Sequence, residues 1–302
     1  LMIQEKVLVT GASGFIGQRL VKFLLDRDFQ VIVLTRQANR VAKHPNMKWI
    51  QHFDEIQTHQ IDYVVNLAGE SIGDGRWTDA RKKQLIQSRV ETTQQLYRYL
   101  QKNKMKPKRI ISGSAIGFYG IDPSELWAKS CNEHSEPQAI FMSELCQQWE
   151  QEALKDAEQD TRIIRLGIVF GQGGGILPKM LLPIKLNLIG KIGSGKQPIT
   201  WVHMDDVIQA IYFLFKTTST DKIYNVVAPD HISQAEFANI TALTLKRKPF
   251  LSLPAWVMRL MMGEQSQLVL NGQYVKPNAL MEAGFKFKYS DYKLALKNIM
   301  GE

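Results

Sequence analysis

The amino-acid sequence predicts an α/β fold: a Rossmann-like, doubly wound parallel sheet with a small, mainly helical C-terminal subdomain on the substrate side. The first half of the chain alternates short apolar strands with helices, which is typical of parallel sheets. One strand, QVIVLT at residues 30–35, is apolar almost throughout, as a strand buried on both faces requires. A glycine-rich turn joins the first strand to the first helix.

The spacing of apolar residues places the individual elements. We expect strands at residues 6–10, 30–35, 63–68, 109–112 and 162–166, and helices at 15–27, 78–103 and 140–157. After Gly171 the segments GQGGG (171–175) and GKIGSG (190–195) bracket a mostly apolar helical stretch. Beyond it we expect a helix at 205–215, a strand at 223–227, a helix opened by a Ser233–Glu236 capping box, and a helical tail over 249–302.

These elements divide the chain into two units. Residues 1–171, with returning segments at about 200–228, are assigned to a nucleotide-binding core. Residues 172–199 and 229–302 are assigned to the substrate-side subdomain. The 302 residues, 44% of them hydrophobic, suffice to bury a core of this size.

Composition argues against several classes of protein. The sequence has no run of about 18 uncharged apolar residues, so we expect neither a membrane span nor a membrane partner. The first strand is predicted almost at the start of the sequence, so we expect no secretory leader. Cys131 and Cys146 match no disulfide or metal framework, and the six histidines are scattered. We therefore expect a cytoplasmic protein without a metal site.

The net charge of +9 suits an anionic ligand, whether a dinucleotide, an acidic substrate or nucleic acid. Much of the excess lies between Arg81 and Arg109, where Glu91 is the only acidic residue. Because this segment also has the pattern of an amphipathic helix, a solvated basic face explains it more simply than a nucleic-acid partner.

The glycine-rich turn has the spacing Gly-x-x-Gly-x-x-Gly. Such glycines allow a tight turn, a close approach to a pyrophosphate, and contact between helix and strand. The helix that follows presents free amides and partial positive charge to an anion. The turn therefore predicts a dinucleotide site, and its residues are Gly11, Ala12, Ser13, Gly14, Phe15, Ile16 and Gly17.

The end of the second strand favours NADP(H) over NAD. An NAD site usually has an acidic residue there, which accepts hydrogen bonds from the ribose hydroxyls. This chain has Thr35 and Arg36 instead. An arginine can pair with a 2′-phosphate and stack on adenine, although a plain surface arginine is the alternative.

Several segments together resemble the extended short-chain dehydrogenase/reductase family, which includes nucleotide-sugar epimerases and dehydratases. They are TGASGFIG at the turn, NLAG at 66–69, SGSAIGFYG at 112–120, RLGIVFG at 165–171 and WVHMDDV at 201–207. The order and spacing also match, over residues 5–230. Segments at 76–78, 88–90 and 277–287 resemble a narrower epimerase-like branch that carries a C-terminal domain of unknown function.

The resemblance implies roles for residues at the ends of the third and fourth predicted strands. Asn66, Leu67, Ala68 and Gly69 would line the cofactor beneath its ribose and nicotinamide. Residues 112–114 would lie beside the reacting carbon. The family's catalytic hydroxyl, counted back from Tyr119-Gly120, falls on Ala115, and Ser114 stands one place earlier.

The family's proton-transfer pair is missing. A Tyr-x-x-x-Lys pair on the next helix normally exchanges a proton with the substrate, because the lysine lowers the pKa of the tyrosine. In this chain those places fall on Phe141 and Leu145, which cannot exchange protons.

Three interpretations therefore remain open. In the first, the chain is an oxidoreductase or epimerase with relocated acid–base groups, for which the candidates are Ser114, Tyr119, Glu70 and Glu144. In the second, it binds NADP(H) without turnover, as a sensor or scaffold. In the third, the basic face binds nucleic acid. We expect the first, with a dinucleotide and a small anionic substrate as partners, and a homodimer by analogy with the family.

The substrate contacts are predicted at Glu70, Arg76, Trp77 and Arg89. Arg89 stands at the border of a helix's buried face, where a guanidinium needs an anion from a substrate or from an acid such as Glu91. Arg76 and Trp77 could clamp a ligand or simply pack. His203, with Asp205 and Asp206, is interpreted as a hinge and helix start rather than a general base.

Overall fold

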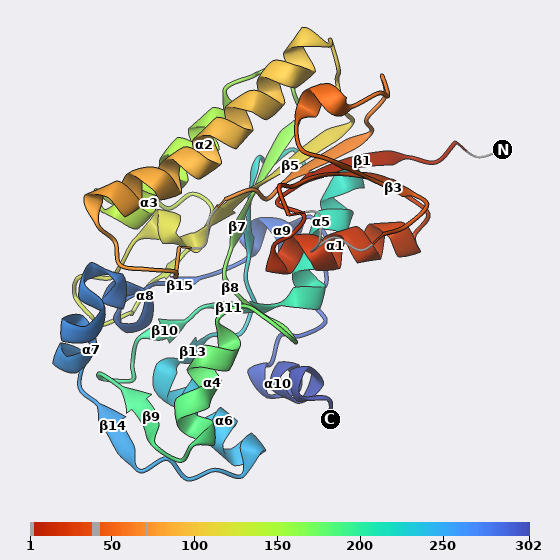
Figure 1. The fold of residues 1–302 in the computed structure, drawn as a ribbon. Helices are drawn as coiled ribbons and strands as arrows, with labels where there is room; N and C mark the ends of the chain where they lie inside the picture. The colour runs from red at the N-terminus through yellow and green to blue at the C-terminus, as the bar shows by residue number, and fades with distance from the viewer. Residues whose placement is uncertain (1–2, 38–42, 70–71) are drawn as a thin grey trace.

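A seven-stranded parallel sheet forms the centre of the protein (Figure 1). The computed structural model describes residues 3–37, 43–69 and 72–302. The strands lie in the order β12-β7-β5-β4-β1-β2-β3, and every neighbouring pair is parallel. Their bounds are Lys6–Thr10 (β1), Gln30–Leu34 (β2), Met47–Ile50 (β3), Tyr63–Asn66 (β4), Arg109–Ala115 (β5), Thr161–Leu166 (β7) and Ile223–Val226 (β12). The predicted Rossmann-like α/β fold is confirmed.

Helices cover both faces of this sheet. On one face, α1 (Phe15–Asp26) and α5 (Met204–Lys216) share a core with Val7 and Val9 of β1. On the other face, α2 (Asp79–Lys102) and α3 (Phe141–Leu154) pack against each other, and both contribute to a core with Leu8. Successive residues of a strand point to opposite faces. The continuous apolar runs in the sequence follow from this burial on both sides.

The sequence analysis missed one strand of the seven-stranded sheet, and it did not predict the short strands outside that sheet. The strand β3 lies at the edge of the sheet, where its Lys48 and Trp49 are exposed. The four residues of this strand, MKWI, are too few and are interrupted by Lys48, so they form no continuous apolar run and the pattern used for the other strands does not detect them. The remaining predicted strands and helices of the first half are present, with bounds that differ by a few residues.

Beyond the seven-stranded sheet and the four helices that cover it, the chain forms short elements, most of them in its second half. Ser233 accepts a hydrogen bond from the amide of Glu236 at 3.2 Å, which confirms the predicted helix start. A separate hydrophobic cluster of these elements contains the aromatic rings of Phe170, Trp201, Phe237 and Tyr292. The elements are β6 (Ser130–Cys131), β8 (Ile168–Phe170), α4 (Leu177–Lys185), β9 (Ile189–Ile192), β10 (Pro198–Ile199), β11 (Trp201–His203), β13 (Ile232–Ser233), α6 (Gln234–Leu245), β14 (Leu251–Leu253), α7 (Ala255–Met262), α8 (Gln267–Leu270), β15 (Tyr274–Val275), α9 (Asn278–Glu282) and α10 (Tyr292–Met300).

The described part of the chain contains neither a membrane-spanning helix nor a cluster of metal-binding side chains. None of the helices there is long and apolar enough to cross a membrane. The same residues contain no group of three or more His, Cys, Asp or Glu side chains that could hold a metal ion.

His203 and Asp206 attach the C-terminal tail to the start of α5. The Nδ1 atom of His203 accepts from the amide of Asp205 at 2.9 Å, and its Nε2 lies 2.9 Å from Oδ1 of Asn298. The imidazole also stacks on Tyr289, with ring centroids 4.0 Å apart. The carboxylate of Asp206 accepts from the amides of residues 288 and 289. His203 and Asp206 thus cap α5 and bind the C-terminal tail, an arrangement that we call the clasp. This agrees with the interpretation of His203 as a structural residue.

This clasp predicts an acid-sensitive contribution to stability. Burial holds the pKa of His203 below its ordinary value of 6.5, although the nearby Asp205 acts in the opposite direction. The folded protein therefore binds this proton less readily than the unfolded chain does. The free energy of unfolding should fall as the pH drops below about 6.5, the unfolded value of this residue.

Denaturant unfolding between pH 7.5 and about 5 would measure this loss. The variant His203→Asn can still cap the helix but cannot titrate, so its stability should change less over the same range. Equal pH profiles for the two proteins would contradict the prediction.

Candidate functional site

The predicted glycine turn follows β1 at the carboxyl edge of the sheet, where two backbone segments come very close. Gly11 has a φ of +68°, and a Cβ atom there would lie 2.6 Å from the carbonyl oxygen of Leu67. A Cβ on Gly17 would lie 2.1 Å from the carbonyl oxygen of Gly11. Both distances are far shorter than any real contact, so the turn can only be built with glycine at these positions.

The first helix begins at this turn with its amides uncapped by side chains. Among the described residues, no side chain accepts a hydrogen bond at the N-cap Gly14, and the first turn of α1 contains no acidic residue. A helix start of this kind offers backbone N–H groups and partial positive charge to an anion. Ser13, Phe15 and Ile16 are all partly accessible there. The geometry fits a dinucleotide pyrophosphate.

A buried hydroxyl fixes the second loop of the site. Thr10 donates to Oδ1 of Asn66 at 2.6 Å and accepts from the amides of Leu67 (3.1 Å) and Ala68 (3.2 Å). The side-chain amide nitrogen of Asn66 donates a hydrogen bond to the Thr93 hydroxyl at 2.9 Å. The Asn66 side chain is therefore turned into the protein, where it holds the 66–68 backbone in place. Any contact of this loop with a ligand has to come from the other atoms of the segment.

The end of β2 presents a cation and no carboxylate. Thr35 is buried, and its carbonyl oxygen accepts from the Trp49 indole at 2.7 Å. The next residue, Arg36, is exposed. An exposed guanidinium at this strand end fits an additional phosphate group better than a pair of ribose hydroxyls.

The second glycine segment lies against the start of α1. A Cβ atom on Gly174 or Gly175 would approach the ring of Phe15 to 2.7 Å and 2.8 Å. Arg19 of α1 donates to the carbonyl oxygen of Gln172 at 2.5 Å. The segment 171–175 thus belongs to the surroundings of the turn at 11–17, a proximity that their separation in sequence did not reveal.

The two places of the usual proton-transfer pair are occupied by packed apolar side chains. Phe141 is the first residue of α3, and its ring lies 5.0 Å from that of Trp77. Leu145 is buried one turn later in the same apolar cluster. The helix α3 is therefore present at the predicted place, but its positions 141 and 145 carry no titratable group.

Below the ends of β5 and β7 lies a buried network of polar side chains. Glu150 of α3 accepts two hydrogen bonds from Arg165, at 2.7 Å and 3.0 Å, and one from the Ser114 hydroxyl at 2.5 Å. Arg165 also donates to the Tyr119 hydroxyl at 2.9 Å, and Tyr119 donates to Asn225 at 2.7 Å. The side chains of Arg165 and Glu150 are only 4% and 6% exposed. A buried charge pair of this kind is retained only when such partners satisfy it.

Both catalytic candidates, Ser114 and Tyr119, form hydrogen bonds within this network. Burial raises the pKa of Tyr119 to about 12, although the neighbouring Arg165 acts to lower it. The phenolate form is therefore disfavoured near neutral pH. Both hydroxyls donate to acceptors inside the protein, and this geometry favours a positioning role for Ser114 and Tyr119.

Sequence reasoning missed Glu150, Arg165 and Asn225. One signal was available: Arg165 lies between the apolar Ile164 and Leu166 in the predicted strand at 162–166. A buried guanidinium requires a buried anion. The sequence does not say which acid supplies it, because Glu150 lies 15 residues away on a different element.

The predicted substrate residues lie in different surroundings. Arg76 donates to the carbonyl oxygens of Leu260 (3.4 Å) and Met261 (2.8 Å), and so attaches its loop to α7. The Trp77 indole donates to the carbonyl oxygen of Ile72 at 3.0 Å, and Trp77 is buried. These two residues hold the wall of the site rather than project freely from it.

Arg89 lies beneath the loop after β4. It is 9% exposed, its guanidinium is 5.1 Å from the Trp149 ring, and a Cβ on Gly69 would come within 2.9 Å of its side chain. It also donates to the carbonyl oxygen of Leu85 at 3.0 Å. Glu144 is exposed in the first turn of α3. Glu70 lies outside the described residues.

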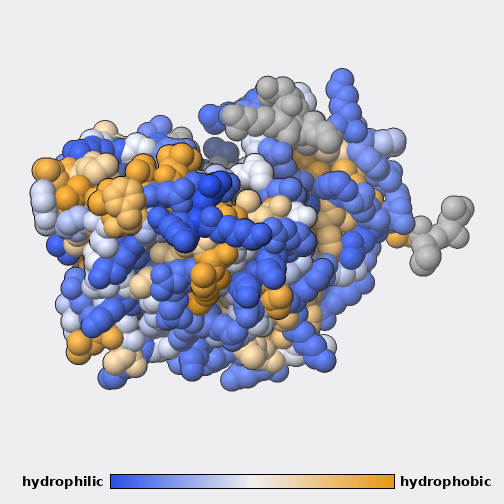
Figure 2. Space-filling model, turned by 90° about the horizontal axis from the view of Figure 1, so that it is seen from below, coloured by the Kyte–Doolittle hydropathy of each residue, from blue (hydrophilic) through white to orange (hydrophobic). Residues whose placement is uncertain are grey.

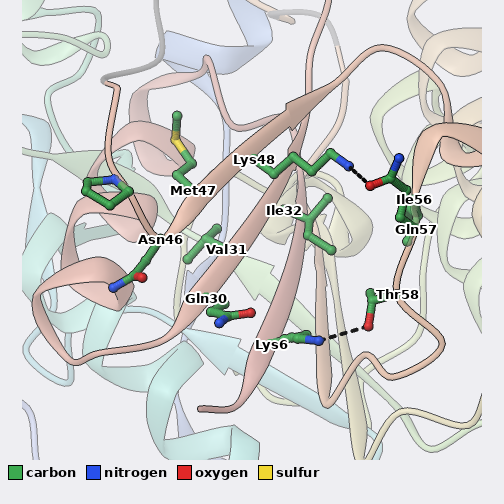
Figure 3. Close-up of a pocket in the computed structure, with 11 residues that line it drawn as sticks. Lys6, Gln30, Val31, Ile32, Asn46, Met47, Lys48, Ile56, Gln57 and Thr58 are labelled. Carbon is green, nitrogen blue, oxygen red and sulfur yellow. Dashed lines mark hydrogen bonds between the residues drawn. The ribbon is translucent and has the colours of Figure 1, made fainter.

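A cavity of about 290 Å³ opens elsewhere, at the amino ends of the strands (Figure 3). Its walls come from the starts of β1, β2 and β3 and from residues 56–58. The two lysines that line it are engaged: Lys6 donates to Thr58 at 2.9 Å and Lys48 to Gln57 at 3.1 Å. Ligands of open parallel sheets bind at the carboxyl ends of the strands, so this cavity does not belong to the candidate site.

The parallel sheet, the glycine turn and the uncapped helix start together define a Rossmann-type dinucleotide-binding class of protein. The model of the NAD dependent epimerase/dehydratase family matches residues 7–227, which is most of the chain. This chain therefore belongs to that family. A second family, described only as a domain of unknown function, matches residues 253–299. The resemblance found in the sequence is confirmed in both parts.

Individual relatives match over nearly the whole chain. An epimerase family protein of Staphylococcus saprophyticus is 36% identical over 298 residues, covering 97% of this chain and 98% of that protein. The structure of human epimerase family protein SDR39U1 (isoform 2) with NADPH has 31% identity and a TM-score of 0.86, covering 97% and 98% of the two chains. A nucleoside-diphosphate sugar epimerase from Corynebacterium glutamicum has 26% identity and a TM-score of 0.77, covering 99% of this chain and 59% of that one.

The close approach at Gly11 predicts a severe effect of one added methyl group. In Gly11→Ala the new Cβ would collide with the Leu67 backbone, so we expect the loop to be displaced and dinucleotide affinity to fall by at least about tenfold. Calorimetric titration with NADPH, together with thermal unfolding, would measure both effects. Gly75→Ala is the matched control, because Gly75 also has a positive φ (+78°) but nothing lies within 4 Å of its Cβ position. Equal losses in both variants would contradict the steric explanation.

The buried network predicts that Glu150→Gln loses about 3–5 kcal/mol of folding free energy, because the Arg165 charge stays buried without a full partner. Denaturant unfolding would measure the loss. Glu144→Gln, an exposed change on the same helix, should lie within about 0.5 kcal/mol of the parent protein. A small effect of Glu150→Gln would show that the pair does not stabilise the strand ends.

Proposed function

We propose that this protein binds NADP(H) and acts as an oxidoreductase or epimerase on a carbonyl, alcohol or nucleotide-linked substrate. The observation that carries the proposal is the glycine turn with its uncapped helix start, followed at the next strand end by Arg36 in place of an acid. The human relative whose structure was determined with NADPH supports the choice of cofactor.

Different residues of the site would contact different parts of the cofactor. The amides of residues 11–17 would hold the pyrophosphate, and Arg36 would pair with the 2′-phosphate. The segment 66–69, fixed by Thr10, would lie beneath the ribose and nicotinamide. The bound cofactor supplies or accepts a hydride. Arg76 and Trp77 form the wall of the substrate side, and Arg89 supports the loop at Gly69 from below.

Proton transfer is the step for which the chain departs from its family. Phe141 and Leu145 cannot exchange a proton, and the hydroxyls of Ser114 and Tyr119 already donate within the buried network. We infer that these two hydroxyls position the ends of β5 and the segment after it, and that water provides the proton in any turnover.

A second candidate function rests on the same two apolar residues. Phe141 and Leu145 suit a protein that binds NADP(H) as a sensor or scaffold without chemistry. The two functions differ in one measurable property. An enzyme oxidises bound NADPH when a suitable carbonyl compound is added, whereas a sensor binds the cofactor tightly and shows no turnover with any compound of a broad carbonyl panel.

The cofactor choice predicts a selective effect of Arg36→Ser. Loss of a charge-assisted contact with the 2′-phosphate should weaken NADPH binding by about tenfold to a hundredfold and leave NADH binding nearly unchanged. Calorimetric or fluorescence titration with both coenzymes would measure the change. Arg98→Ser removes an exposed arginine of α2 and serves as the control. The proposal fails if millimolar NADPH and NADH give neither heat nor thermal protection with the parent protein.

The positioning role predicts the behaviour of Tyr119→Phe. Removing a buried hydroxyl that bonds both Arg165 and Asn225 should destabilise the fold by about 1–3 kcal/mol. In the folded variant, kcat and its pH profile should stay close to those of the parent. A fall of kcat by about a hundredfold or more without loss of stability would instead identify Tyr119 as a proton donor.

A further inference from the structure

The second half of the chain contains two segments with an unusual charge composition. Residues 172–204 and 237–263 contain no aspartate or glutamate at all. They carry eight cationic side chains, which are Lys179, Lys185, Lys191, Lys196, Lys246, Arg247, Lys248 and Arg259. A chain with 29 acidic residues leaves two such stretches free of them, so the positive charge of this part is concentrated rather than evenly spread.

The fold brings the two segments together into one continuous strip. The strands β9 and β14 pair, with the Leu251 amide donating to the carbonyl oxygen of Leu188 at 2.9 Å. The Lys248 amide donates to the side chain of Asn187 at 2.7 Å. The helix α7 follows β14 directly, after Pro254. We call this strip, residues 186–193 together with 246–261, the β9–β14–α7 face.

Large apolar side chains of this face are directed to solvent. The most exposed are Phe250 (75%), Leu260 (73%), Trp256 (66%), Met261 (62%) and Leu186 (56%). Trp256 and Leu260 are one turn apart on α7, whereas Met258 of the same helix is buried. Figure 2 views the molecule from the side where β9 and β14 lie in Figure 1, and shows apolar side chains gathered beside blue, hydrophilic ones at the left. Clustered exposed side chains of this size mark an interaction surface.

The cations of the same face are available to a partner. Lys246, Arg247 and Lys248 are exposed, and none of them forms an ion pair with a residue that the structure describes. Lys191 on β9 is exposed in the same way. Arg259 lies 3.8 Å from Glu125, so its charge is partly compensated. The face therefore combines an apolar helix side with a row of uncompensated positive charges.

We propose that the β9–β14–α7 face docks on an anionic lipid surface, with α7 lying in the headgroup layer. Tryptophan, leucine and methionine on one side of a helix, flanked by lysine and arginine, suit the boundary between anionic headgroups and acyl chains. A second copy of this chain would place the same cations against one another and be repelled. Nucleic acid matches the charge but offers no apolar partner for the leucines and the methionine. This inference goes beyond the proposed function and replaces the expectation that no membrane is a partner; the helix lies on the surface and does not span it.

The face is attached to the wall of the candidate site. Arg76 holds the last carbonyl groups of α7, Lys82 lies 2.7 Å from Glu264, and Gln265 donates to the carbonyl oxygen of Gly73 at 2.9 Å. These contacts join the segment after α7 to the loop between β4 and α2. A lipid surface bound at α7 would thus lie next to the substrate side of the protein.

Co-sedimentation of the full chain with vesicles tests the proposal without any cofactor. We expect binding to phosphatidylcholine vesicles that contain roughly a third phosphatidylglycerol, and at least tenfold weaker binding to phosphatidylcholine alone. No binding to the anionic vesicles at low salt would overturn the proposal. NADPH titration of the same preparation reports on the proposed function independently, so either idea can fail alone.

A charge-matched pair of triple variants locates the site. Replacing Lys246, Arg247 and Lys248 by glutamine should weaken vesicle binding by about a hundredfold, since each basic residue near an anionic surface contributes about 1 kcal/mol. The control replaces the exposed Lys102, Lys104 and Lys106 by glutamine; Lys104 has the same left-handed backbone conformation as Lys246. Equal losses in both variants would overturn the proposal, because net charge rather than this face would then govern binding.

Tryptophan fluorescence tests the apolar half of the contact. Trp256 is the most exposed of the described tryptophans, so vesicle binding should shift the emission to shorter wavelength, and Trp256→Phe should abolish that shift. The double variant Trp256→Ser with Leu260→Ser should lose at least tenfold in vesicle affinity, whereas the exposed pair Met281→Ser with Leu294→Ser should not. Binding to DNA or heparin as strong as to anionic vesicles, with no shift of Trp256 emission, would identify a general polyanion surface instead and overturn the proposal.

Discussion

The carboxyl edge of the sheet depends on the approach of two backbone segments, one after β1 and one after β4. Gly11 meets Leu67 so closely that no side chain fits between them, and the Thr10 hydroxyl ties the same segments together from below. Because α1 begins at this point, the approach also decides where the uncapped amides of its first turn are directed. The helix start, the loop at 66–69 and the strand end at Arg36 are arranged around this one contact.

Cofactor recognition and proton transfer rest on different parts of the molecule. The first uses backbone amides and glycines, which persist wherever the turn is kept. The second needs particular side chains, and here those places hold Phe141 and Leu145. The polar side chains near the strand ends instead form a buried ion pair between Glu150 and Arg165. The Ser114 and Tyr119 hydroxyls form hydrogen bonds with this pair. A family member can therefore retain the fold and the dinucleotide geometry while its acid–base chemistry changes.

The sequence predicted the regular parts of this fold better than the orientation of individual polar side chains. Strands buried on both faces leave continuous apolar runs, and the glycine spacing at 11–17 has few structural solutions. The edge strand β3 leaves no such run and went undetected. Arg76 and Trp77 were predicted as substrate contacts, yet the hydrogen bond from Arg76 to α7 joins segments 185 residues apart, which the sequence pattern does not show.

By itself the sequence determined the Rossmann-like class, the position of the glycine turn and the cation at the second strand end. It also determined that Phe141 and Leu145 occupy the two places of the family's Tyr-x-x-x-Lys pair. Each of these is a local property, encoded by residue type and spacing within one or two elements. Only the tertiary structure decided which acid pairs with Arg165, that Ser114 and Tyr119 donate inward, and that the two acid-free segments form one face. These outcomes depend on contacts between distant segments, where burial and charge compensation select among partners that the linear order does not distinguish.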